Sequence, residues 1–176
     1  NGKTDRGATN KLSLALANRF GHIDVEPDAD AWNAWAEGAG VDPLLIAFLK
    51  FRPGLLYTES KDGRTFASPR QWEESAKYLA PTFTNKIRGS MVHALVGEGP
   101  GAEFEAFIRA ARELPKLEDI LANPTGAAVP QGASARYAVA LALARRATPG
   151  NFAAVLSYVG RLPKEFGILT VTDAIK

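Results

Sequence analysis

The sequence contains no cysteine and only two histidines, His22 and His93, which lie far apart. Without cysteine the chain can form no disulfide bond and no thiolate metal site, and an intracellular, cytoplasmic setting is favoured. Two distant histidines also argue against a histidine-based zinc site. We therefore expect the chain to bind no metal.

Long hydrophobic runs and a strong charge of one sign are also missing. No apolar run is long enough to cross a bilayer, so we expect no membrane partner. The net charge of +2 is too small to argue for nucleic acid, although a pI of about 8.9 does not exclude it. The chain lacks a GxxxxGK[ST] phosphate loop and a hydrophobic run ending in paired acids, which would hold Mg²⁺.

Most of the chain has the pattern of helices, and hydrophobic residues make up 46% of it, enough for one or two modest cores. A strand is predicted only at Gly21–Val25, with Ile23 and Val25 on one face and Pro27 closing it. A hairpin near Leu56–Phe66 is a further possibility. A single strand has no partner in a helical chain. We therefore interpret the chain as a piece of a longer protein.

The helix expected at the centre of the core covers Leu44–Leu49, which is apolar nearly all round, and Arg52-Pro53-Gly54 ends it. Before it, Asp28 caps a helix with Trp32, Trp35 and Ala36 on one face. After it, Ser68 opens a helix that reaches Leu79, with Gln71 completing a capping box. Further helices are predicted at Asn85–Val96, Ala102–Leu114, Ser134–Ala147 and Pro149–Val159, separated by the segments Gly97–Gly101 and Asn123–Gly126.

Arg70 is the most informative charged residue on physical grounds. A cation in the first turn of a helix faces the positive end of the helix dipole, which disfavours it by a few tenths of a kcal/mol. The same helix end presents free N–H groups that suit an anion, and an arginine there could hold a phosphate bidentately. The alternative, favoured by spacing alone, is that Arg70 points to solvent or pairs with Glu73 or Glu74.

Other candidate residues have a structural interpretation that is favoured on sequence alone. Arg19 follows a short apolar turn and precedes the predicted strand, and an ordinary surface arginine would fit there. The tryptophans could stack on bases, but their helical spacing is typical of core residues. Arg145 and Arg146 complement the end of an Ala-rich helix, with contact to DNA as a minor alternative.

Several motifs together resemble the end of an AAA+ ATPase core of the MoxR-like group. They are Asp5-Arg6-Gly7, Leu12-Ser13, Leu16-Ala17-Asn18-Arg19-Phe20 with His22-Ile23 and Glu26, Ile46 to Pro53, and Ser68-Pro69-Arg70-Gln71-Trp72-Glu73. The resemblance covers roughly Asn1 to Leu79. It implies a remnant of the nucleotide-binding core at 1–27, a helical lid domain at 28–90 and a helical C-terminal extension at 91–176.

The resemblance also implies roles for individual residues. Asn1 matches sensor 1, near the γ-phosphate, and Arg19 matches the arginine finger that acts in trans on a neighbouring subunit's nucleotide. Arg70 matches sensor 2 and, with Ser68 and Pro69, would contribute to nucleotide binding. ATP and Mg²⁺ are then the cofactors of the full-length protein, and we expect neither to be bound by this fragment.

The function implied is that of a part of a MoxR-like ATPase, contributing sensor and finger residues to ATP hydrolysis in a homo-oligomeric ring that remodels a client protein. The fragment itself lacks the phosphate loop and should be inactive alone. The rival interpretation is a stand-alone α-helical adaptor or nucleic-acid-binding module without nucleotide chemistry. A phosphate loop encoded upstream of Asn1 would favour the first interpretation.

Overall fold

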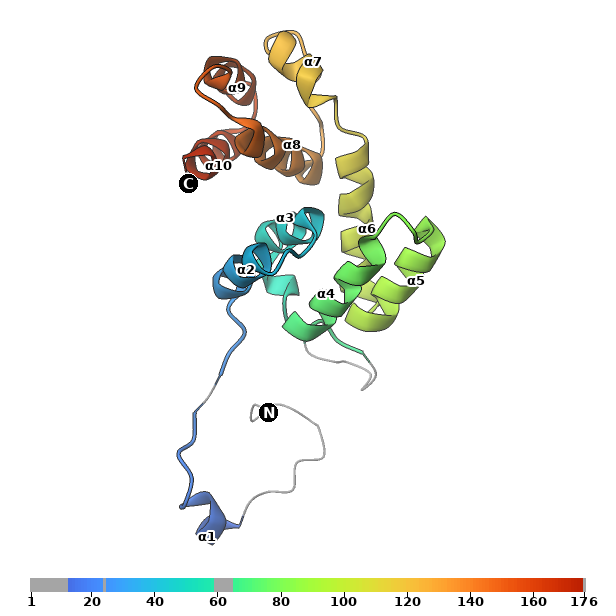
Figure 1. Ribbon diagram of the computed structural model, residues 1–176, viewed down its shortest axis with the longest axis vertical. Coiled ribbons are helices and arrows are strands. Elements are labelled where there is room, and N and C mark those ends of the chain that lie inside the picture. Colours follow the sequence, from blue (N-terminus) through green and yellow to red (C-terminus); the bar gives the residue numbers. More distant parts are fainter. Residues whose placement is uncertain (1–12, 24, 59–64, 176) are drawn as a thin grey trace.

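The computed structural model describes residues 13–23, 25–58 and 65–175, and it is helical (Figure 1). The predicted mainly α fold is confirmed. The helices are α1 (Leu14–Ala17), α2 (Ala29–Gly38), α3 (Pro43–Phe51), α4 (Pro69–Ala76), α5 (Asn85–Val96), α6 (Glu98–Arg112), α7 (Leu117–Ala122), α8 (Ala133–Arg146), α9 (Phe152–Val159) and α10 (Lys164–Ala174), with 3-10 turns η1 (Pro53–Leu55) and η2 (Lys77–Leu79). In the described part of the chain, no helix has the length and apolar character that a membrane span requires.

The starts of α2, α3 and α4 follow the local capping rules that predicted them. The Asp28 carboxylate accepts hydrogen bonds from the N–H groups of Asp30 and Ala31, at 2.9 and 3.0 Å. The Asp42 carboxylate accepts the N–H of Leu44 at 2.8 Å, and Pro43 occupies the first turn. Each cap satisfies donors that have no partner inside the helix.

Helix α3 lies at the centre of the core, as predicted. The residues from Leu45 to Leu49 are all buried. The ring of Phe48 contacts those of Trp72, Phe104 and Phe107, with centroids 5.6, 5.0 and 5.6 Å apart. One side chain of α3 therefore joins α4 and α6 around a shared aromatic cluster.

The Ala-rich helix α8 extends the core, because it packs against helices that precede it and helices that follow it in the chain. It packs against α3, α6 and α10, and the ring centroid of Phe51 on α3 lies 4.9 Å from that of Tyr137 on α8. The buried hydroxyl of Thr170 on α10 lies 3.3 Å from the carbonyl oxygen of Ala140. The alanines of α8 let its neighbours approach closely, and most of the buried hydrophobic residues form one continuous core.

The predicted strand at Gly21–Val25 does not form in the described residues 21–23 and 25, which have no regular secondary structure. Ile23 and Val25 are 86% and 87% exposed. A strand needs a neighbour to take its backbone hydrogen bonds, and this segment extends away from the helical body (Figure 1). We call the described residues 13–23 and 25–28 the arm.

The possible hairpin near Leu56–Phe66 falls partly on residues 59–64, which lie outside the described residues. At its described ends, the Thr58 N–H donates to the carbonyl of Ala67 at 3.0 Å, and the Ala67 N–H donates to the Thr58 hydroxyl at 3.1 Å. These bonds close the loop, but the described ends contain no strand.

Three details of the predicted helices differ. Trp35 is 46% exposed, so only Trp32 and Ala36 of the expected face are buried. Helix α6 begins at Glu98 instead of Ala102, because Pro100 stands in the first turn, where its missing N–H costs nothing. The sequence prediction also omitted α7 and α10.

The proposed domain boundary at residue 90 falls inside α5, and the division into domains stays a prediction.

A buried ion pair joins α5 to α6. The guanidinium of Arg88, which is 5% exposed, lies 3.2 Å from the carboxylate of Glu105. The side-chain carbonyl of Asn85 accepts hydrogen bonds from both Arg88 and Arg112, each at 3.0 Å. Because the charges of Arg88 and Glu105 pair with each other and Asn85 links Arg112 to them, the network has a structural role.

Candidate functional site

The candidate site is a hollow of about 420 Å³ at the start of α4. Its lining residues are Thr65, Phe66, Ser68, Pro69, Arg70 and Gln71. Three of them, Ser68, Pro69 and Arg70, are the residues that the sequence singled out for nucleotide binding. The structure therefore brings these three predicted residues together at the edge of one hollow.

Helix α4 is held firmly behind this hollow. Trp72 is fully buried, its indole N–H donates to the carbonyl of Leu55 at 2.8 Å, and its ring meets that of Phe104 edge-on at 5.7 Å. Ser75 is also buried and donates to the carbonyl of Trp72 at 2.7 Å. The first turn of α4 is thereby fixed relative to the core.

The cap of α4 leaves little free hydrogen-bonding capacity in the backbone. Ser68 has an extended backbone, and its hydroxyl accepts the N–H of Gln71 at 3.4 Å. Pro69 has no N–H to offer. Arg70 therefore carries the one backbone N–H of this first turn that no described residue engages. An anion in the hollow would depend mainly on the Arg70 guanidinium.

Arg70 itself is exposed and makes no ion pair with any described residue. One of its two possible acidic neighbours, Glu74, pairs instead with Lys77 at 2.7 Å. The alternative that the sequence leaves open is that Arg70 points to solvent or pairs with Glu73 or Glu74. Neither pairing is observed, and the guanidinium faces solvent beside the hollow, as the first part of that alternative states. No described residue engages its hydrogen-bond donors in an ion pair.

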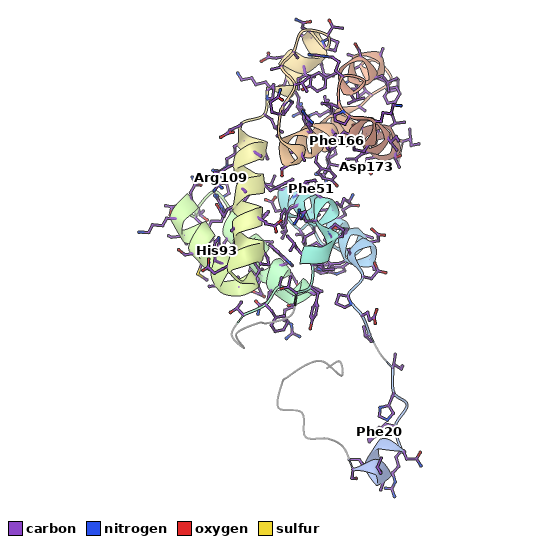
Figure 2. All side chains as sticks on the ribbon, turned by 180° about the vertical axis from the view of Figure 1, so that it is seen from behind. Phe20, Phe51, His93, Arg109, Phe166 and Asp173 are labelled. Atoms are coloured by element: carbon purple, nitrogen blue, oxygen red, sulfur yellow. The ribbon has the colours of Figure 1, made fainter. Side chains whose placement is uncertain are left out.

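The other two candidate residues lie elsewhere. Arg19 is exposed and follows α1 in the arm, where its N–H donates to the carbonyl of Leu16 at 3.0 Å. Helix α1 stands well apart from α4 (Figure 1), and the neighbouring Phe20 lies at the far end of the arm (Figure 2). The structure thus does not bring Arg19 and Arg70 together. Asn1 lies outside the described residues.

The described residues of the hollow are suited to binding an anion. A guanidinium and a helix start suit a phosphate or carboxylate. Among the described residues, no acid, histidine or lysine that could transfer a proton lines the hollow. Within residues 13–23, 25–58 and 65–175, no group of three or more His, Asp or Glu side chains could hold a metal ion. His93 is engaged with Glu98, 2.9 Å from its Nδ1 atom.

Comparison with known proteins adds no relative. No protein-family profile, curated protein or solved structure matches the chain.

Proposed function

We propose that the chain is the C-terminal part of a MoxR-like AAA+ ATPase, comprising the end of the ATPase core, the helical lid and a helical extension. In the complete protein, water attacks the γ-phosphate of ATP while arginines stabilise the charge of the transition state. The ring formed by such subunits remodels a client protein. The sequence motifs around Arg19 and Arg70 are the basis of this proposal.

The observation that supports it best is the guanidinium of Arg70 at the edge of the hollow, which forms no ion pair with a described residue. Helix capping by Ser68 and the anchoring of Trp72 fix the backbone around it. A lid arginine that contacts the phosphates of the nucleotide in its own subunit requires such a rigid backbone and a guanidinium that is not already paired. A surface arginine engaged by Glu74 would not meet this requirement.

The rival function is a stand-alone helical adaptor or a nucleic-acid-binding module. Under this function Arg70 would not contact a nucleotide, and the arm would not belong to an ATPase core. The coding sequence upstream of Asn1 separates the two functions. A phosphate loop about one core's length before Asn1 favours the ATPase, and an initiator methionine directly before Asn1 refutes it.

The Arg70→Ala variant of the complete protein tests the role of this residue. A positioned arginine can contribute a factor of about 10³ to 10⁵ to phosphoryl transfer. We therefore expect ATPase turnover to fall by a factor of at least about 10³. Arg109→Ala, an exposed arginine on α6, is the matched control and should keep full turnover. Equal turnover of the Arg70→Ala variant and the unmodified protein would refute the role.

A further inference from the structure

A second hollow lies where the start of α3, the end of α6, the start of α7 and the end of α8 meet. Its volume is about 470 Å³. Its buried lining residues include Phe107 and Leu141, which we call its floor, and the partly exposed Leu44 and Leu114 line it as well. We call this hollow the four-helix groove. None of its residues belongs to the candidate nucleotide site.

The four-helix groove opens to solvent. Leu44, Ala111, Leu114 and Ala142 line it and are only half-buried. Small-molecule pockets usually bury 70 to 90% of their ligand, which an open groove does not do. Apolar side chains that project from one face of a helix fit such a groove, with the rest of the helix left in solvent.

The charged groups at the groove decide which segment fits. The Asp42 carboxylate is engaged in capping α3, through the N–H of Leu44 at 2.8 Å. Arg146 forms an ion pair with Glu118 of α7 at 3.1 Å. Arg145 also lines the groove and is exposed, and it has no ion pair among the described residues. One positive charge is therefore left beside an apolar floor.

We propose that the four-helix groove docks an amphipathic helical segment of a partner protein, with apolar side chains on the floor and a carboxylate paired with Arg145. Opposite charges across an interface fix the register of the partner and favour it over neutral or basic competitors. This inference is independent of the ATPase proposal, because it uses neither Arg70 nor Arg19.

A library of random short peptides displayed against the complete 176-residue chain tests the proposal. The enriched peptides should carry apolar residues at helical spacing next to Asp or Glu. Synthesised with a fluorescent label, they should bind the Arg145→Glu variant at least about tenfold more weakly, which corresponds to about 1.4 kcal/mol. Replacing the acidic residue of the peptide by lysine should restore binding to that variant.

Two further variants control the result. Arg109→Glu changes the same charge on an exposed site of α6 outside the groove and should leave peptide binding unchanged. Ala142→Glu adds a negative charge inside the groove and should weaken binding as Arg145→Glu does. The helical circular dichroism of each variant shows whether it is folded.

The proposal is overturned if no peptide is enriched, if the enriched peptides show no acidic preference, or if Arg145→Glu and Arg109→Glu act alike. A second copy of the chain is the other occupant to consider, because the arm also carries exposed apolar residues, Ile23 and Val25. Sedimentation that shows a dimer, dissolved both by Ile23→Asp and by Ala142→Glu in the groove, would assign the groove to that copy and overturn the proposal of a partner protein.

Discussion

Burial on α8 raises the pKa of Tyr137 to about 12, with the negative charge of Asp173 adding to the effect and Arg145 opposing it. The folded protein thus keeps this phenolic proton at a pH where the unfolded chain, with a tyrosine pKa of about 10, releases it. The contribution to stability is complete below about pH 10 and is lost as the pH rises through about 12. Alkaline conditions should therefore destabilise the fold partly through this residue.

The variant Tyr137→Phe isolates this contribution, because phenylalanine has no proton to lose. We expect its urea midpoint to fall less steeply than that of the unmodified chain as the pH rises from about 10 towards 12. Tyr57→Phe serves as the matched control, because Tyr57 is 41% exposed, and it should keep the original slope. Identical slopes for all three proteins would show that Tyr137 is not responsible.

At the scale of the elements, α3 depends most on a single side chain. Phe48 contacts three aromatic rings from α4 and α6, so Phe48→Ala should leave a cavity that the neighbours cannot fill. We expect a loss of roughly 3–5 kcal/mol in the free energy of unfolding, measured by urea titration. Trp35→Ala removes a larger but half-exposed ring and should cost less. The reverse order would contradict the central place of α3.

The elements that the sequence predicted are those with local signals. Capping residues and an apolar run specify α3 and α4 within a few residues. Helix α10 has no such signal, since Gly167 and the β-branched Thr170 lower its helix propensity, and its contacts with α8 stabilise it instead. The early start of α6 has a local reason, Pro100 in its first turn, but its packing on α5 depends on a tertiary fit. A Cβ atom at Gly101 would lie 2.6 Å from Cδ2 of His93, so the glycine permits α5 and α6 to meet.

The two hollows also differ in whether neighbouring residues or distant ones form them. Ser68, Pro69 and Arg70 are consecutive residues, so their gathering at the start of α4 could be predicted from the sequence. The four-helix groove assembles Leu44, Phe107 and Leu141 from three separate helices, and no local pattern relates such distant positions. Arg145 was predicted to complement the end of its helix, with contact to DNA as a minor alternative, and its place beside the groove follows from tertiary packing.

At the scale of the whole molecule, the separate positions of Arg19 and Arg70 give the ATPase proposal its sharpest prediction. Under that proposal Arg70 belongs to the lid and would act on the nucleotide of its own subunit. Arg19, on the arm, would act on that of a neighbour. Single substitutions cannot distinguish these roles, because each should lower turnover by a large factor, of about 10³ or more. Mixed rings of the complete protein can distinguish them.

Arg19→Ala subunits are mixed with subunits whose own phosphate loop is disabled. Some sites then combine an intact pocket with an intact arginine from the neighbour, and ATPase turnover should rise above that of either variant alone. The same mixture made with Arg70→Ala should show no rise, because the damaged lid remains attached to the intact pocket. Rescue of Arg70→Ala without rescue of Arg19→Ala would mean that the two roles are reversed.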